Sequence, residues 1–143
     1  MKILDANLLL YAYDSDSLRH REAKKWLEGI FSQNELIGLP WQSALAFLRV
    51  MSDTRLPGRR LTIDEAVEIV ETWAELPQVR FLSPGADHWR FLRQMLITGD
   101  AKGRMGSDAE LAALTVEYGG VLYSNDRDFA RFPGLRWVNP LES

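Results

Sequence analysis

Apolar residues along this chain follow two spacings, one typical of buried strands and the other typical of amphipathic helices. Short apolar runs predict strands at 3–4, 35–40, 79–82, 121–123 and 135–138. Apolar positions that recur every three or four residues predict helices at 8–13, 18–31, 41–51, 62–76, 87–97 and 107–118. Because strands alternate with helices, we expect an α/β fold with a mostly parallel, twisted sheet of about five strands that helices cover on both faces.

Polar residues predict where two of these helices begin. Thr62-Ile63-Asp64-Glu65 and Ser107-Asp108-Ala109-Glu110 both match the capping box, in which Ser or Thr is followed three residues later by Glu. In the helix at 41–51 the spacing places Leu45 and Leu48 toward the core, with Trp41 as a further candidate. That helix carries no acidic residue.

Composition changes this picture only by exclusion. A chain of 143 residues favours one domain, 1–143. The absence of cysteine excludes disulfides, thiolate zinc sites and a cysteine nucleophile. The chain begins without a secretory signal pattern and has no apolar run long enough to cross a bilayer, so we expect a cytoplasmic protein without a membrane partner.

Acidic residues recur where predicted strands meet predicted helices. Asp5 follows the first strand, Asp108 opens a late helix, and Asp126 and Asp128 follow the strand at 121–123. A single aspartate at such a junction is explained equally well as a helix cap. The functional interpretation therefore depends on the set, because the carboxyl ends of parallel strands share one edge, where α/β folds bind ligands.

Carboxylates gathered at one edge repel one another unless cations or protons intervene. A site of hard oxygen ligands without Cys or His suits Mg²⁺ or Mn²⁺. Such a metal could lower the pKa of a bound water and stabilise a leaving oxyanion, which predicts phosphodiester hydrolysis. Asn7 and Ser124 could hold the carboxylates or the attacking water in place.

The net charge of −3 does not by itself indicate nucleic-acid binding. Thirteen of the seventeen cationic residues are nevertheless arginine, which suits bidentate phosphate contacts. Candidate RNA contacts lie in two loops, although solvated surface loops explain them equally well; the candidates are Arg55, Arg59 and Arg60 in one loop and Lys102 and Arg104 in the other.

Three segments carry a family resemblance. They are Leu4-Asp5-Ala6-Asn7-Leu8-Leu9, then Ser107-Asp108-Ala109-Glu110-Leu111-Ala112-Ala113, and finally Leu122-Tyr123-Ser124-Asn125-Asp126-Arg127-Asp128-Phe129. In this order they resemble PIN-domain ribonucleases and, more narrowly, the VapC toxins of bacterial toxin–antitoxin pairs. The resemblance covers nearly the whole chain.

The resemblance implies a PIN-like three-layer α/β/α domain and a Mg²⁺- or Mn²⁺-dependent endoribonuclease toxin that acts on RNA. It also implies a homodimer and a cognate VapB-like antitoxin whose tail fills the acidic pocket. By position, Asp5, Asp108 and Asp126 would be the catalytic metal-site carboxylates, Asp128 an accessory metal ligand and Ser124 a polar support.

The sequence departs from the family pattern at one position. The family usually has a glutamate near the position of Ala46, and no acidic residue lies there. Two other functions therefore stay open. One is a weak or inactive relative that binds RNA or a protein, and the other is a metal-dependent nuclease for DNA or a phosphatase-like hydrolase.

Overall fold

Five short strands form one parallel sheet in the order β3-β2-β1-β4-β5. The computed structural model describes residues 1–142. The described elements are β1 (Lys2–Leu4), α1 (Ala6–Tyr13), α2 (His20–Phe31), β2 (Ile37–Pro40), α3 (Trp41–Met51), α4 (Ile63–Ala74), β3 (Val79–Leu82), α5 (His88–Thr98), α6 (Met105–Glu117), β4 (Val121–Tyr123), the 3₁₀ helix η1 (Arg127–Arg131) and β5 (Trp137–Val138). The predicted α/β fold with a parallel sheet is confirmed.

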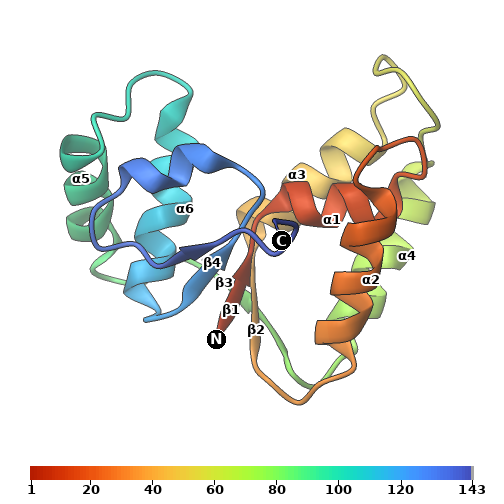
Figure 1. Ribbon diagram of the computed structural model, residues 1–143, viewed down its shortest axis with the longest axis horizontal. Helices are drawn as coiled ribbons and strands as arrows, with labels where there is room; N and C mark the ends of the chain where they lie inside the picture. The colour runs from red at the N-terminus through yellow and green to blue at the C-terminus, as the bar shows by residue number, and fades with distance from the viewer. Residues whose placement is uncertain (143) are drawn as a thin grey trace.

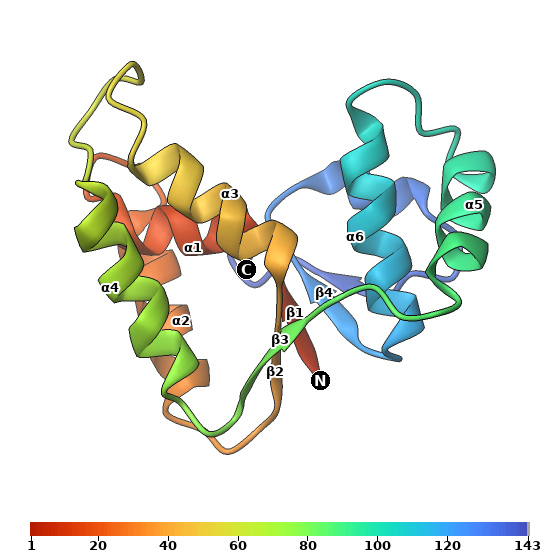
Figure 2. The same cartoon turned by 180° about the vertical axis from the view of Figure 1, so that it is seen from behind.

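Helices cover both faces of the sheet, with α1 to α4 on one side and α5 and α6 on the other (Figures 1 and 2). Within β1, Ile3 packs in the core shared with α5 and α6, whereas Leu4 packs in the core shared with α1 to α4. Successive side chains of a strand point to opposite faces, so this central strand is apolar at both positions. On the Leu4 side, the rings of Phe47 and Trp73 pack edge to face, with their centroids 4.8 Å apart.

The carboxyl ends of the strands lie together between two raised loops. In Figure 1 the loop between α3 and α4 (yellow) and the loop between α5 and α6 (teal) rise on either side of the point where β1 continues into α1. β1 pairs with β4 so that Leu4 lies opposite Tyr123. Asp5 and Ser124, the next residue on each chain segment, therefore leave the sheet side by side.

The prediction of which face α3 buries was wrong for Leu45 and Trp41, whereas Leu48 is half-buried. Leu45 is 60% exposed and Trp41 is 47% exposed, whereas Ala44 and Phe47 are buried. The helix begins at Trp41 directly after Pro40, and this short junction fixes its rotation about its axis. Trp41 instead stacks on Phe81, with ring centroids 4.5 Å apart.

One of the two predicted capping boxes exists. Thr62 and Glu65 make both reciprocal bonds at the start of α4. By contrast, α6 begins at Met105, and the hydroxyl of Ser107 donates to the Arg104 carbonyl (3.0 Å) from inside the helix. The preceding Gly103, at φ +59°, lets the chain turn into the helix before the polar sequence is reached.

None of the helices in residues 1–142 is both long enough and apolar enough to span a membrane.

Candidate active site at the carboxyl edge of the sheet

Asp5 lies between β1 and α1 and is held by both of its carboxylate oxygens. Its Oδ1 accepts the backbone N–H of Ala6 at 2.7 Å, and its Oδ2 accepts the hydroxyl of Ser124 at 2.6 Å. The first bond makes Asp5 the N-cap of α1. The second bond reaches the end of β4, so Asp5 is oriented by two elements at once.

Ser124 connects Asp5 to the acidic turn that follows β4. The residue is fully buried. Its hydroxyl oxygen accepts the backbone N–H of Asp126 at 3.0 Å and the side-chain amide of Asn7 at 3.2 Å while it donates to Asp5. The side-chain oxygen of Asn7, Oδ1, in turn accepts the backbone N–H of Asn125 at 3.4 Å. The two residues expected to give polar support therefore lie in one network with the carboxylates.

Three further carboxylates approach closely beside this network. One oxygen from each of Asp108, Asp126 and Asp128 lies within 4.8 Å of the other two. Asp126 caps η1 by accepting the N–H of Asp128 at 2.9 Å, which holds one of its oxygens and leaves the other for a ligand. Asp108 comes from a different element, the first turn of α6.

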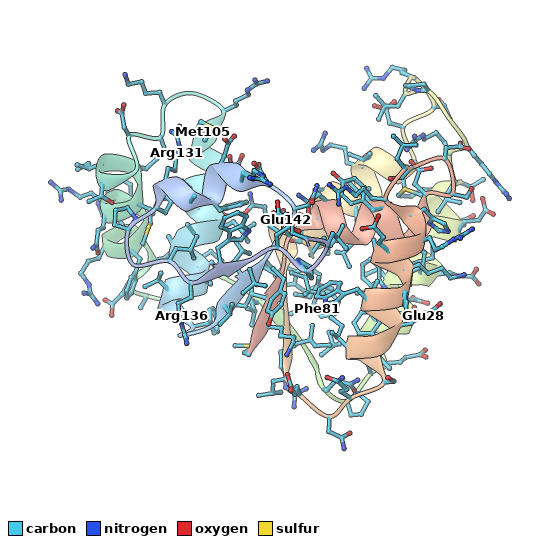
Figure 3. The ribbon with its side chains drawn as sticks, viewed as in Figure 1. Glu28, Phe81, Met105, Arg131, Arg136 and Glu142 are labelled. Carbon is cyan, nitrogen blue, oxygen red and sulfur yellow. The ribbon has the colours of Figure 1, made fainter. Side chains whose placement is uncertain are left out.

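Negative charge is poorly compensated in this site. Burial, and then the charges of Asp126, Asp5 and Asp128, raise the pKa of Asp108 to about 6, against the opposing effect of Arg131. Burial also raises the pKa of Asp5, although its bonds from Ser124 and Ala6 act in the other direction. Arg131 lies near the start of α6, labelled at Met105 in Figure 3.

A cavity of about 620 Å³ opens between α3 and α6 beside Asp5 and Asp108. Asp5 and Asp108 line it from one side, and Gln42, Ala46 and Arg49 line it from α3. The sequence interpretation missed Gln42 and Arg49. Both lie on the same helical face as Ala46, at spacings of four and three residues, and this face would have been found had α3 been assigned the correct rotation.

The cationic candidates differ in their availability. Arg60 points inward, where it lies 3.7 Å from Asp14 and donates to the Pro57 carbonyl at 2.6 Å, contrary to its expected place on a nucleic-acid surface. Arg55 is held by both oxygens of Asp53. Lys102 is exposed, and its Nζ lies 3.6 Å from a carboxylate oxygen of Asp100. Among the described residues, the side chains of Arg49, Arg59 and Arg104 are exposed and make no ion pair or hydrogen bond.

The site has the chemistry of a divalent-cation site. The donors are carboxylates, and the group formed by Asp108, Asp126 and Asp128 could hold a metal ion. Oxygen donors without sulfur or imidazole suit Mg²⁺ and Mn²⁺. The raised pKa of Asp108 is the expected result when such a group lacks positive charge. The residues present therefore fit a hard divalent cation.

Comparison with known proteins identifies the family. The family model of the PIN domain matches residues 2–135. The chain belongs to the PIN-domain family. It is 37% identical over 140 residues to Ribonuclease VapC37 of Mycobacterium tuberculosis (strain ATCC 25618 / H37Rv), an alignment that covers 98% of this chain and 97% of that protein. The resemblance to VapC ribonucleases is thereby confirmed.

Solved structures show the same fold at low sequence identity. VapBC2 from Rickettsia felis, bound to a DNA fragment from their promoter, matches with a TM-score of 0.70 and 15% identity over 96% of this chain and 97% of that chain. VapC20 of Mycobacterium tuberculosis, a sarcin-ricin loop cleaving toxin, matches with a TM-score of 0.68 and 19% identity over 95% of this chain and 99% of that chain. These matches show that the chain shares its fold with both proteins.

Proposed function

We propose that this PIN-domain protein is a divalent-metal-dependent endoribonuclease that acts as a toxin in the cytoplasm. The observation that carries the proposal is the approach of Asp108, Asp126 and Asp128 within 4.8 Å, beside a half-buried Asp5. The group joins two elements that are far apart in the sequence, because Asp108 comes from α6 whereas Asp126 and Asp128 come from the turn after β4. The similarity to VapC ribonucleases supports RNA as the substrate.

The chain's own residues hold the reacting groups. Asp108, Asp126 and Asp128 would bind Mg²⁺ or Mn²⁺ together with Asp5, and Ser124 fixes the orientation of Asp5. When bound, the cation neutralises charge on a phosphodiester and makes a nearby water more acidic. The carboxylates around it would position that water and accept its proton.

Cations at the rim of the cavity would contact RNA phosphates. Arg49 lines the cavity. Arg104 and Lys102 stand on the loop between α5 and α6, which rises on one side of the point where β1 continues into α1 (Figure 1). Arg59 lies on the opposite raised loop, between α3 and α4. An RNA strand laid between the two loops would pass over the carboxylates.

The Arg49→Ala, Arg104→Ala double variant is expected to bind RNA more weakly and with a flatter salt dependence. Each lost phosphate contact reduces the slope of log affinity against log salt by about 0.7 for single-stranded nucleic acid, so the double variant should lose about 1.4. Binding is measured by fluorescence anisotropy in EDTA, which prevents metal-dependent cleavage. Arg93→Ala, an exposed arginine on α5, is the matched control. An unchanged slope in the double variant would remove these residues from the RNA surface.

We further propose that a cognate antitoxin inhibits the protein through this cavity. The uncompensated carboxylates would attract a cationic side chain, which would occupy the position of the metal ion and block the path of the RNA. The occurrence of VapBC2 among proteins of similar fold supports such a partner.

A homodimer is also proposed, through the apolar side chains that α3 and α4 leave exposed. Leu45 on α3 and Ile63 on α4 are 60% and 55% exposed. Isolated exposed apolar residues are common, but several on two adjacent helices favour a contact between protein surfaces.

The substrate class is tested with RNA and DNA oligonucleotides of the same sequence, each incubated with Mn²⁺ or with EDTA. We expect cleavage of RNA in Mn²⁺ and none of DNA. Cleavage of both would instead indicate a general metal-dependent nuclease. Binding of RNA without cleavage in any metal would favour the inactive binding module.

A further inference from the structure

Gln42 carries an unpaired oxygen at the wall of the acidic cavity. Its side-chain Nε2 donates to the carbonyl of Ser107 at 2.9 Å, across the gap between α3 and α6. Its Oε1 is buried and has no hydrogen-bond partner among the described residues. Buried polar oxygens without a partner are rare in folded proteins, and each requires an explanation such as an absent water or ion.

The orientation of this amide is chemically determined. The Ser107 carbonyl can only accept a hydrogen bond, so the NH₂ group of Gln42 must face it. The Oε1 atom is thereby directed away from Ser107. Gln42 lines the same cavity as Asp5 and Asp108, so this amide of α3 lies near two of the carboxylates.

We propose that Gln42 is the contribution of α3 to the cation site, as a neutral oxygen that takes the role of the acidic residue absent at Ala46. This inference rests on the proposed metal dependence of the site. Mg²⁺ and Mn²⁺ keep several waters when they bind proteins. A buried amide oxygen at the edge of the site would accept a hydrogen bond from such a water and so fix the position of the cation. Gln42 is therefore a positioning residue.

The inference is tested by titrating metal-free protein with Mn²⁺ at pH 7.5 and measuring free Mn²⁺ by electron paramagnetic resonance, without RNA. Loss of a residue that supports metal ligands typically weakens metal binding by about 10- to 100-fold. We expect Gln42→Leu to weaken Mn²⁺ binding at least about tenfold by this reasoning. Gln42→Glu should bind Mn²⁺ at least as tightly as wild type.

The two variants separate the oxygen from the amide donor, because glutamate keeps an acceptor and loses the bond to Ser107. If the bond to Ser107 were the only role of Gln42, Gln42→Glu would weaken binding as much as Gln42→Leu, and the inference would be overturned. Gln78→Leu is the matched control, since Gln78 also donates its Nε2 to backbone carbonyls, those of Phe31 and Gln33, but does not line the cavity.

The titration also distinguishes this inference from the proposed function. Equal Mn²⁺ affinity in wild type and Gln42→Leu, with RNA cleavage by wild type, would overturn the role of Gln42 alone. A wild-type protein that neither binds Mn²⁺ nor cleaves RNA would overturn both proposals.

Discussion

The Asp108→Asn variant is expected to melt at a higher temperature than the wild-type protein in the absence of metal, and to have lost RNA cleavage. The carboxyl of Asp108 has its pKa raised from 3.8 to about 6 by burial and by neighbouring acids. Its ionised form is therefore disfavoured in the folded protein. Asparagine removes that charge together with its capacity to bind a cation, so stability and activity should change in opposite directions.

The pH dependence follows from the direction of the pKa shift. Between about pH 4 and pH 6 the folded protein binds this proton more tightly than the unfolded chain, so stability falls as the pH rises through that window and stays lowered above it. Because the side chain is only half-buried, we expect Asp108→Asn to exceed wild type by about 1 kcal/mol in the free energy of unfolding at pH 7.5. This corresponds to about 3 °C in Tm. The difference from wild type should vanish near pH 4.

Thermal melts in EDTA at the two pH values provide the measurement. Asp64→Asn is the matched control, because Asp64 also lies in the first turn of a helix but is exposed. There the change removes a favourable interaction with the helix dipole, so a slightly lower Tm and unchanged cleavage are expected. An Asp108→Asn protein that melts below wild type at pH 7.5 and still cleaves RNA would contradict the assigned role of Asp108.

The Asp5→Asn variant is expected to remain folded and to lose cleavage by at least about 100-fold, as for the loss of a metal-site residue. Asparagine is as good an N-cap as aspartate, so α1 keeps its start. Loss of the acceptor for the Ser124 hydroxyl is offset by removal of a charge that burial disfavours. The loss of activity then reports the charge at Asp5, measured as initial cleavage rates in Mn²⁺.

Asp87→Asn tests whether any N-cap substitution has the same effect. Asp87 occupies the N-cap position of α5 without a side-chain capping bond, and the nearby Gly85 lies against Glu117 at the far end of α6, so replacement of Asp87 should leave the cleavage rate unchanged. If Asp5→Asn cleaves as fast as this control, Asp5 is a cap and has no catalytic role.

The elements were predictable where local signals were strong. The strands at 79–82 and 121–123 and the helix at 41–51 have the predicted bounds, because Pro40, Pro77 and Gly119-Gly120 end one element before the next begins. The order of the strands was not predictable, since β1 pairs with β2 and β4 through contacts far apart in sequence. The 3₁₀ helix η1 was missed because its start depends on the cap made by Asp126.

The candidate site was predictable as far as topology alone positions it. Asp5 and Asp126 could be paired in advance because both follow parallel strands, and β1 and β4 turned out to be neighbours. The inward position of Arg60 depends on Asp14, which belongs to another loop. The unpaired oxygen of Gln42 depends on the carbonyl of Ser107. Contacts of this kind are set by packing and leave no local signal in the sequence.

The proposed function requires that these carboxylates form a metal-dependent RNA-cleaving site. It is tested most directly by incubating total cellular RNA with purified, antitoxin-free protein in Mg²⁺, in Mn²⁺ and in EDTA, beside the Asp5→Asn variant. We predict discrete RNA fragments with either metal, and none with EDTA or with the variant. Intact RNA in every lane with folded wild-type protein, or equal cleavage in EDTA, would contradict the account.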